Sequence, residues 1–272
     1  MAAASVVSAL TIAGSDSGGG AGIQADLKTF AAHGVHGLSA LAALTAQHTR
    51  GVTAVEVPPL AFLRAQVDAC FEDFDIGAVK LGMLANAEVI DTVAGLLRQY
   101  RPRWLVLDPV MVATSGARLL QSDALQALRT QLLPLASVIT PNLPEAELLL
   151  GRSIESHAQM REAAGALLDA GAAAVYLKGG HLAVGDEVVD LLADADGVHE
   201  TRRPRLPLDA HGTGCTLASA IAANLGRGLG LREACVAASD YVHEALKRGY
   251  RPGRSEVVVL DHFGAGHATG AG

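Results

Sequence analysis

The sequence has few cysteines and no cluster of basic residues, and each shortage excludes a class of protein. Its 272 residues include three cysteines, widely spaced and without a Cys-x-x-Cys pair. This argues against a disulfide framework and a cysteine-based zinc site, and it favours a reducing compartment. Lysine and arginine together number 21 against 28 acidic residues, which gives a net charge of −7. Without a basic block, we expect no binding to nucleic acid.

Long apolar runs are also missing. Two uncharged stretches, 29–49 and 210–226, come closest to a membrane span. Histidine and glutamine interrupt the first, and the second is shorter than the ~20 apolar residues that a span requires. Residues 1–10 contain no basic residue, so they lack the positive start of a secretory signal. We therefore expect a cytoplasmic protein without a membrane segment.

The residues that are present form short apolar runs that alternate with longer amphipathic runs. Half of the chain is hydrophobic, which is enough to bury a sizeable core. The run Trp-Leu-Val-Leu (104–107) is apolar on both faces, as is typical of parallel strands covered by helices. The alternation predicts an α/β fold with a central, mostly parallel sheet flanked by helices on both faces.

The pattern places each element and suggests one domain. The expected strands are 6–12, 54–57, 76–81, 104–107, 137–140 and 174–177, followed by a hairpin at 187–192 and 198–203. The expected helices are 23–33, 60–71, 87–100, 123–133, 145–150, 156–170, 213–225 and 231–248. No internal repeat or linker divides the chain. We expect a single domain over 1–261 and a flexible tail over 262–272.

Glycine and polar residues follow most of the expected strands. Ligands of open α/β sheets bind beyond the carboxyl ends of the strands, so this placement predicts a site there. The segments are 14–22, Gly82-Met83, Asp108-Pro109-Val110-Met111, Pro141-Asn142-Leu143-Pro144-Glu145 and Lys178-Gly179-Gly180-His181.

The segment 211–216 opens a long helix. Its glycines would let several N–H groups point into one concavity, which suits a phosphate at a helix N-terminus. The alternative is an ordinary glycine-rich cap with Thr213 as the N-cap residue. Cys215 favours function, because the pKa of a thiol at a helix N-terminus is lowered and its thiolate can act as base or nucleophile. The alternative for Cys215 is a small buried hydrophobic residue.

The glycine-rich segment 14–22 resembles a phosphate-binding loop but lacks the Gly-Lys-Ser/Thr ending of a P-loop. Its glycines would instead let a small molecule lie close to the backbone. Asp26 and Gln47 could then supply hydrogen bonds to that molecule's polar edge. Asp26 could equally be an acidic first-turn residue that balances the helix dipole, and that interpretation is favoured.

Carboxylates and one lysine at the strand ends suggest a metal and phosphate site. Asp108 ends an apolar strand, where a carboxylate is costly unless it meets a cation, a donor or a ligand. Asn142 and Glu145 are spaced as a capping box, and they could also hold Mg²⁺ through water. Lys178 could neutralise phosphate oxygens. His48, His181 and His211 lie beside these loops and stay undecided.

Taken together, these segments resemble the hydroxymethylpyrimidine/phosphomethylpyrimidine kinases of thiamine biosynthesis. The resemblance runs in the family's order from about residue 9 to 250. Seven blocks carry it: Ala-Gly-Ser-Asp-Ser-Gly-Gly-Gly-Ala-Gly-Ile-Gln-Ala-Asp-Leu-Lys-Thr-Phe (13–30), Leu-Thr-Ala-Gln (44–47), Lys-Leu-Gly-Met-Leu (80–84), Leu-Asp-Pro-Val-Met (107–111), Ile-Thr-Pro-Asn-Leu-Pro-Glu-Ala (139–146), Leu-Lys-Gly-Gly-His (177–181) and His-Gly-Thr-Gly-Cys-Thr (211–216).

The resemblance implies a ribokinase-like fold, a homodimer, and two phosphorylations that use ATP and Mg²⁺. The first is on the hydroxymethyl group of 4-amino-5-hydroxymethyl-2-methylpyrimidine, and the second is on the resulting monophosphate. Substrate-binding positions would be Gly14, Ala21, Asp26, Gln47, Met83 and Val110, with Gln47 hydrogen-bonded to the ring. The catalytic set would be Lys178 and the anion hole Gly212, Thr213, Gly214 and Cys215. The ATP phosphates would meet Asp108, Asn142, Glu145, Lys178 and Thr213, with Asp108 and Glu145 holding Mg²⁺ through water.

One position departs from the wider ribokinase-like group, in which an aspartate is normally the base. Cys215 stands at that position here, as in the pyrimidine kinase subgroup, so it could act as a base or could orient the substrate hydroxyl. A pyridoxal or pyridoxine kinase is the second hypothesis. A non-catalytic ligand-binding protein on the same scaffold is the third, and the set of residues at the strand ends argues against it.

Overall fold

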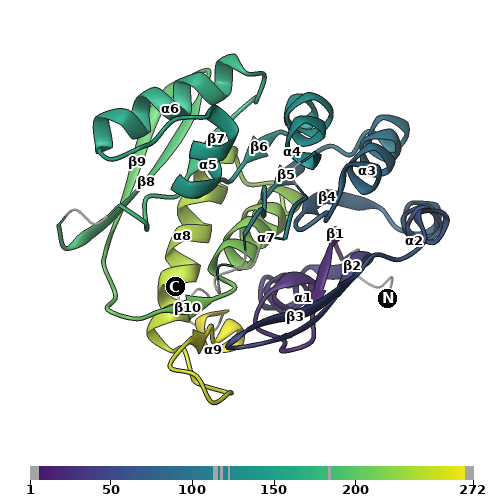
Figure 1. Cartoon of the computed structure of the whole chain (residues 1–272), viewed down its shortest axis with the longest axis horizontal. Coiled ribbons are helices and arrows are strands. Elements are labelled where there is room, and N and C mark those ends of the chain that lie inside the picture. The colour runs from purple at the N-terminus through teal and green to yellow at the C-terminus, as the bar shows by residue number, and fades with distance from the viewer. Residues whose placement is uncertain (1–5, 113–115, 117–118, 122, 183–184, 267–272) are drawn as a thin grey trace, which may run out of the picture.

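The computed structural model describes residues 6–112, 116, 119–121, 123–182 and 185–266. Nine strands form one sheet in the order β3-β2-β1-β4-β5-β6-β7-β8-β9 (Figure 1). Neighbouring strands from β2 to β7 are parallel, and antiparallel pairs are found at the two ends of the sheet. The strands are β1 (Ser8–Asp16), β2 (His36–His48), β3 (Gly51–Glu56), β4 (Ile76–Leu81), β5 (Leu105–Leu107), β6 (Val138–Ile139), β7 (Val175–Leu177), β8 (Glu187–Asp194) and β9 (Gly197–Pro204).

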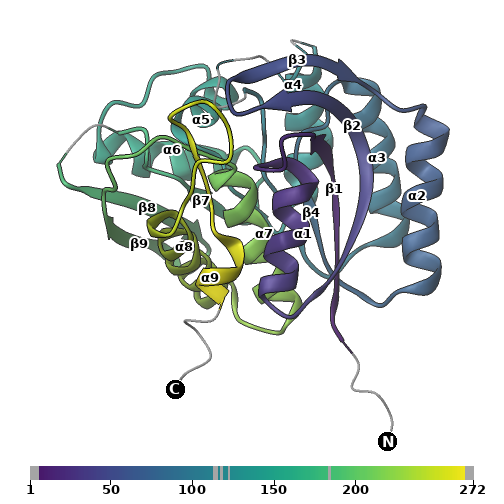
Figure 2. The ribbon, with the colours of Figure 1, turned by 90° about the horizontal axis from the view of Figure 1, so that it is seen from below.

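Helices cover both faces of this sheet, which confirms the predicted α/β architecture (Figure 2). One layer contains α2 (Leu60–Asp73), α3 (Ala87–Tyr100), α4 (Ala124–Ala127), α5 (Leu143–Leu150) and α6 (His157–Asp169). The other contains α1 (Gly22–Ala32), α7 (Thr213–Gly226), α8 (Leu231–Lys247) and α9 (His262–Gly266). Most residues of β4 are apolar because the strand is covered on both faces: Val79 packs in the first layer, whereas its neighbour Ala78 packs in the second.

Most predicted elements are present with small changes at their ends. The β4 and α3 bounds agree with the prediction, and the predicted hairpin is β8–β9. The start of α3 follows from its sequence, because Asn86 Oδ1 accepts a hydrogen bond from the backbone N–H of Val89 at 3.0 Å. Ser156 caps α6 in the same way. Within the described chain, no helix has the length and apolar character to cross a membrane.

Three expectations need correction. Strand β2 was not predicted, because its alanine-rich sequence has low strand propensity. The helix expected over 123–133 is broken into α4, a π-helical turn η1 (Leu128–Leu132) and a 3-10 turn η2 (Leu133–Leu135) that contains Pro134. Residues 262–266 are not a flexible tail, since they form α9 with His262 buried. The remainder of the predicted tail, 267–272, lies outside the described residues.

A second, short sheet positions the start of α7. It pairs β10 (Ala210–His211) with β11 (Val258–Val259) in parallel. The chain passes directly from β10 through Gly212 into α7. This connection sets the N-terminus of α7 at the carboxyl ends of the parallel strands, where the glycine and polar segments meet.

Candidate active site

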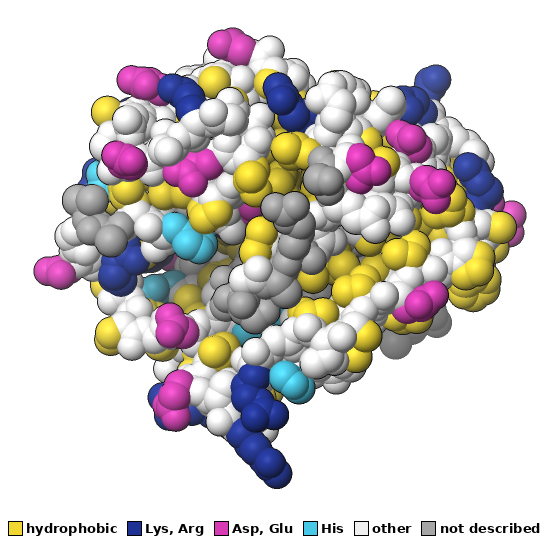
Figure 3. Space-filling view, in the orientation of Figure 1, with side chains coloured by type: hydrophobic (Ala, Val, Ile, Leu, Met, Phe, Trp, Pro, Cys, Tyr) yellow, Lys and Arg dark blue, Asp and Glu magenta, His cyan; other side chains and the backbone are white. Residues whose placement is uncertain are grey.

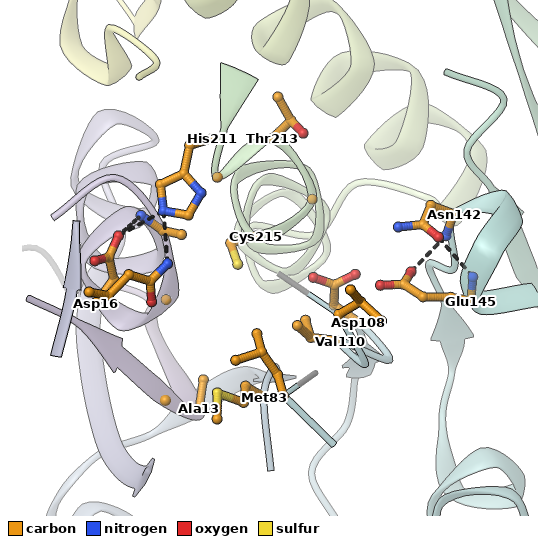
Figure 4. Close-up of a pocket in the computed structure, with 18 of the residues that line it drawn as sticks. Ala13, Asp16, Met83, Asp108, Val110, Asn142, Glu145, His211, Thr213 and Cys215 are labelled. Carbon is orange, nitrogen blue, oxygen red and sulfur yellow. Dashed lines mark hydrogen bonds and ion pairs between the residues drawn. The ribbon is translucent and has the colours of Figure 1, made fainter. Parts of the chain in front are cut away.

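A cavity of about 450 Å³ lies at the carboxyl ends of the parallel strands. It brings together side chains from β1, β2, β4 and the loops after β5, β6 and β7 with the start of α7 (Figure 4). Of the predicted site residues, these line it: Gly14, Ala21, Gln47, Met83, Asp108, Val110, Asn142, Glu145, Lys178, Gly212, Thr213, Gly214 and Cys215. Asp26 is the exception.

The turn into α7 depends on Gly212. Its φ of +89° is left-handed, and a Cβ there would lie 1.9 Å from the carbonyl oxygen of Gly20. Gly212 itself is the N-cap residue of α7 and no side chain caps it, so the alternative with Thr213 as N-cap is wrong. Thr213, Gly214 and Cys215 then form the first turn, where helix N–H groups lack partners within the helix. This end of α7 is therefore suited to an anion.

The predicted low pKa of Cys215 is wrong. Burial raises the pKa of the thiol to about 11, and the Lys80 ammonium only partly opposes that rise. At neutral pH Cys215 is a neutral thiol that can donate or accept a weak hydrogen bond.

Asp108, Glu145 and Lys178 form a charged group on one side of the cavity. Lys178 Nζ lies 3.0 Å from Asp108 Oδ1 and 3.8 Å from Glu145 Oε2. Burial alone would lower the pKa of Lys178, but the two carboxylates raise it, so the ammonium stays charged. Burial, followed by repulsion from Asp108, raises the pKa of Glu145 to about 7 against the attraction of Lys178.

Asn142 and Glu145 form the predicted capping box of α5. Asn142 Oδ1 accepts from the Glu145 N–H at 2.9 Å, and Glu145 Oε2 accepts from the Asn142 N–H at 2.8 Å. The backbone of Asn142 therefore engages Glu145 Oε2, and a backbone hydrogen bond from Met111 also stabilises the carboxylate. The capping interpretation is confirmed, and it is compatible with a role of Glu145 in binding Mg²⁺ through water.

The residues of the cavity suit a Mg²⁺ ion bound through water molecules better than one bound by protein ligands alone. The described residues contain no group of three or more His, Cys, Asp or Glu side chains placed to hold a metal ion. Two carboxylates, Asp108 and Glu145, face the same cavity, and Lys178 lies beside both of them. Mg²⁺ commonly binds one or two carboxylates and completes its shell with water and phosphate oxygens.

On the opposite side of the cavity, Asp16 and His211 form a pair that sequence reasoning missed (Figure 4). His211 Nε2 lies 2.9 Å from Asp16 Oδ2, and Asp16 also accepts hydrogen bonds from the backbone N–H groups of Gly18, Gly20 and Ala21. A Cβ on Gly20 would lie 2.8 Å from His211 Cδ2. The backbone of the glycine-rich loop thus wraps around the Asp16 carboxylate. Asp16 is the one acidic residue of segment 14–22, and this was the sequence feature that could have indicated its role.

Asp26 does not line the cavity, which corrects its predicted place in the substrate pocket. Its carboxylate is fully buried, and it accepts hydrogen bonds from Thr11, Lys80 and Ser219. It is not in the first turn of α1 either. Lys80 reaches the cavity instead, and the signal for it was a lone charge within the apolar run of β4.

Apolar residues form the remaining surface of the cavity. Met83 is buried in a small cluster with Ala43 and Ala85, and Val110 packs against that cluster. Gly14 permits the close approach of Met83, since a Cβ there would lie 3.0 Å from the Met83 sulfur. The cavity therefore joins an apolar surface with a polar end at Gln47 to a charged end at Asp108 and Lys178.

A mostly parallel sheet between helical layers, with a glycine turn leading into a helix beside a buried Asp–Lys pair, defines a ribokinase-like kinase. The profile of the phosphomethylpyrimidine kinase family matches residues 16–259, and the chain belongs to that family.

Relatives agree with this membership. A hydroxymethylpyrimidine/phosphomethylpyrimidine kinase of Rhizobium meliloti (strain 1021) is 53% identical over 245 residues, which cover 89% of this chain and 91% of that protein. The crystal structure of a phosphomethylpyrimidine kinase from Clostridium difficile 630 superposes with a TM-score of 0.79 at 42% sequence identity. The match covers 88% of this chain and 99% of that one. A pyridoxal kinase from Staphylococcus aureus in complex with AMP-PCP and pyridoxal is 33% identical with a TM-score of 0.86, over 95% of this chain and 94% of that one.

Proposed function

We propose that this protein phosphorylates 4-amino-5-hydroxymethyl-2-methylpyrimidine and then its monophosphate to the diphosphate, in thiamine biosynthesis. The observation that carries the proposal is the division of one cavity. Its apolar part, with Met83, Val110 and Gln47, suits a small heterocycle, and its charged part, with Asp108 and Lys178, suits polyphosphate. The start of α7 lines the same cavity, and Cys215 points into it near Val110 and Asp108, where a phosphoryl group would be transferred (Figure 4).

ATP is the proposed phosphoryl donor, and Mg²⁺ the proposed ion. Asp108 and Glu145 would hold the ion through water, with Asn142 nearby to fix the Glu145 side chain. When bound, Mg²⁺ neutralises the charge of the phosphate oxygens that it meets. Lys178 and the backbone N–H groups of 213–215 would stabilise negative charge on the transferring group, since preorganised donors cost no rearrangement during the reaction.

Cys215 would orient the substrate hydroxyl rather than remove its proton. Its pKa of about 11 leaves little thiolate at neutral pH. Phosphoryl transfer depends mainly on positioning and charge neutralisation, so a neutral hydrogen-bonding group beside the hydroxyl is sufficient.

A coupled assay of ADP release tests the activity. The pyrimidine, its monophosphate and pyridoxal would each be offered separately, with and without Mg²⁺. We expect release with both pyrimidines, dependent on Mg²⁺, and a higher kcat/KM for the pyrimidines than for pyridoxal. Pyridoxal is included because the S. aureus pyridoxal kinase has the same fold. A higher kcat/KM for pyridoxal would support that second function, and no release with any of the three would support a binding protein.

The proposal extends to the form of the protein. We propose a cytoplasmic homodimer in which each chain is one kinase domain. The continuous nine-stranded sheet supports the single domain. On the described surface that faces the reader in Figure 3, acidic and basic side chains are interspersed, in keeping with a small-molecule partner rather than nucleic acid. Light scattering of the purified chain tests the dimer, for which we expect twice the 27.9 kDa of one chain.

A further inference from the structure

The Gln47 side-chain amide lies between two groups that decide its orientation. Gln47 Nε2 is 3.2 Å from His211 Nε2, and Gln47 Oε1 is 3.0 Å from Thr45 Oγ1. The oxygen and nitrogen of a glutamine amide have nearly the same shape. Which of them faces which neighbour is therefore settled by whether each neighbour donates or accepts.

Asp16 settles the role of His211. Its Oδ1 accepts from the Gly18 N–H at 2.7 Å, and its Oδ2 accepts from the N–H groups of Gly20 and Ala21 at 3.0 and 2.9 Å. Burial alone would raise the pKa of Asp16, but these bonds and His211 lower it. An ionised carboxylate only accepts, so His211 Nε2, 2.9 Å from Oδ2, must carry the hydrogen and donate it.

The neighbour on the other side has the opposite role. The Thr45 hydroxyl has one hydrogen, and the Ser15 carbonyl oxygen accepts it at 2.8 Å. Thr45 Oγ1 is within hydrogen-bond distance of both the Ser15 and the Gln47 oxygen, and with its hydrogen on the shorter contact to Ser15 it offers only a lone pair to Gln47 at 3.0 Å. Two N–H donors would face each other at His211 and two acceptors at Thr45 unless the amide is turned by 180°. In the reversed amide, the Gln47 oxygen would share the single Nε2–H of His211 with Asp16 Oδ2 in a three-centre hydrogen bond, and the Gln47 nitrogen would donate to Thr45 Oγ1.

The Gln47 backbone cannot move to solve the conflict in another way. Ser17 Oγ donates to the Gln47 carbonyl oxygen at 2.8 Å and accepts from the Gln47 N–H at 2.8 Å. This reciprocal pair fixes the residue to the glycine-rich loop. Rotation of the amide is the remaining adjustment.

We infer that His211, oriented by Asp16, is a specificity-determining positioning residue that fixes the Gln47 amide with its oxygen toward His211 and its nitrogen toward Thr45. The inference rests on the proposed function, together with the hydrogen bond between Gln47 and the pyrimidine ring that the family resemblance implies. The Gln47 amide presents an oxygen acceptor beside an N–H donor. The aminopyrimidine presents the complementary pair, an amino donor beside a ring-nitrogen acceptor. With the hydroxymethyl group directed to the start of α7, a fixed amide pairs with one order of these groups and opposes the reverse order.

A substrate analogue with the reverse order makes this testable. In 5-hydroxymethyl-2-methylpyrimidin-4-one, an oxygen acceptor replaces the amino donor and a ring N–H replaces the acceptor. We expect the wild-type kcat/KM ratio of aminopyrimidine to pyrimidinone to be at least about 100, because a site that hydrogen-bonds its substrate strongly rejects a mismatched one.

Three variants isolate the role of His211. His211→Leu removes the donor and frees the amide to rotate, so the ratio should fall about tenfold or more. His211→Gln keeps an N–H donor and should retain most of the ratio, whereas Thr45→Val removes the acceptor and should also lower it. A role limited to holding the loop would lower kcat/KM for both substrates by the same factor, and an unchanged ratio in His211→Leu would overturn the inference. His199→Leu, on β9 and outside the cavity, is the matched control.

A measurement without substrate separates this inference from the proposed function. Neutron diffraction from crystals grown in D₂O should show deuterium on His211 Nε2 and two deuterons on the Gln47 atom nearest Thr45. Two deuterons on the Gln47 atom that faces His211 would overturn the inference even in an active enzyme. Failure of the wild type to phosphorylate either pyrimidine would overturn the proposed function alone, since the neutron result would still decide the orientation.

Discussion

The Lys80 ammonium lies 2.9 Å from Asp26 Oδ1 and 3.0 Å from Oδ2, and neither side chain is exposed to solvent. Thr11 on β1 and Ser219 on α7 each donate to the same carboxylate at 2.7 Å. The carboxylate on α1 thus joins β1, β4 and α7 directly behind the cavity. These hydrogen bonds compensate the buried charges, which is why a charged pair can lie within an otherwise apolar region.

Removal of one member of the pair should destabilise the protein more than removal of both. We expect Asp26→Leu to lower the free energy of unfolding by about 3–5 kcal/mol, because it leaves a buried ammonium without its partner. The double variant Asp26→Leu/Lys80→Met should be less destabilised than Asp26→Leu. Urea unfolding of the wild type, Asp26→Leu, Lys80→Met and the double variant measures this, and simple additivity of the two single changes would contradict it.

The pair should also stabilise the fold over the whole ordinary pH range. Burial alone would lower the pKa of Lys80, but Asp26 and other nearby groups raise it above the ordinary 10.5. A raised folded-state pKa of a lysine means that its contribution is fully present below the unfolded pKa and is lost only as pH rises beyond it.

Glu145 should make stability depend on pH within the ordinary range. Burial and then Asp108 raise its pKa from 4.5 to about 7, so the folded protein binds a proton more tightly than the unfolded chain does. The free energy of unfolding of the metal-free protein should therefore fall as pH rises from about 4.5 through 7, by roughly 2–3 kcal/mol.

Urea unfolding in EDTA at pH 5 and pH 8 measures this dependence. Glu145→Gln is the control, because its amide oxygen can still accept from the Asn142 N–H of the capping box while it does not titrate. The difference between the two pH values should be smaller in Glu145→Gln. An equal difference in both proteins would show that Glu145 ionises normally.

Local pattern predicted most of the fold. Elements whose stability depends on nearby residues agree well, as with α3 and its Asn86 cap or α5 and its capping box. Strand β2 was missed because its position beside β1, rather than its own sequence, makes it a strand. The break in the helix expected over 123–133 also depends on how that segment packs.

The site was predicted in outline for a similar reason. Parallel strands bring their carboxyl ends together, so residues such as Asp108, Asn142 and Lys178 were expected in one place. Burial depends on the whole fold and cannot be derived from spacing. Three features of the site could therefore not be predicted from the sequence. Asp26 faces Lys80 rather than a ligand, and burial raises the pKa of Cys215. Asp16 pairs with His211, which is 195 positions away in the chain.

Substitution of Cys215 should reduce turnover without abolishing nucleotide binding. We expect Cys215→Ala to lower kcat by about 10²-fold or more with little change in KM for ATP, because a group that orients the hydroxyl acts mainly after binding. Cys215→Ser should retain more activity than Cys215→Ala, since its hydroxyl also forms hydrogen bonds. Steady-state kinetics measures both, and near-normal turnover of Cys215→Ala would remove the thiol from the reaction.

The pKa of Cys215 can be measured directly through alkylation. Only the thiolate reacts, so the rate of iodoacetamide modification should rise about tenfold per pH unit and show no plateau below pH 9. Peptide mass spectrometry separates Cys215 from Cys70 and Cys235. A plateau near neutral pH would mean that the helix N-terminus dominates after all.

The turn at Gly212 should tolerate no side chain. An alanine there would have an unfavourable φ, and its Cβ would lie 1.9 Å from the Gly20 carbonyl oxygen, so the loop or α7 must shift. We expect Gly212→Ala to lower kcat/KM by about 10²-fold or more, because the N–H groups of 213–215 lose their position. Gly165→Ala is the matched control: Gly165 lies inside α6 with open space around its Cβ position, and alanine there should raise the free energy of unfolding by about 0.5–1 kcal/mol. Far-UV circular dichroism and steady-state kinetics of both variants decide the matter, and full activity of a folded Gly212→Ala protein would mean that the start of α7 does not contact the transferring phosphoryl group.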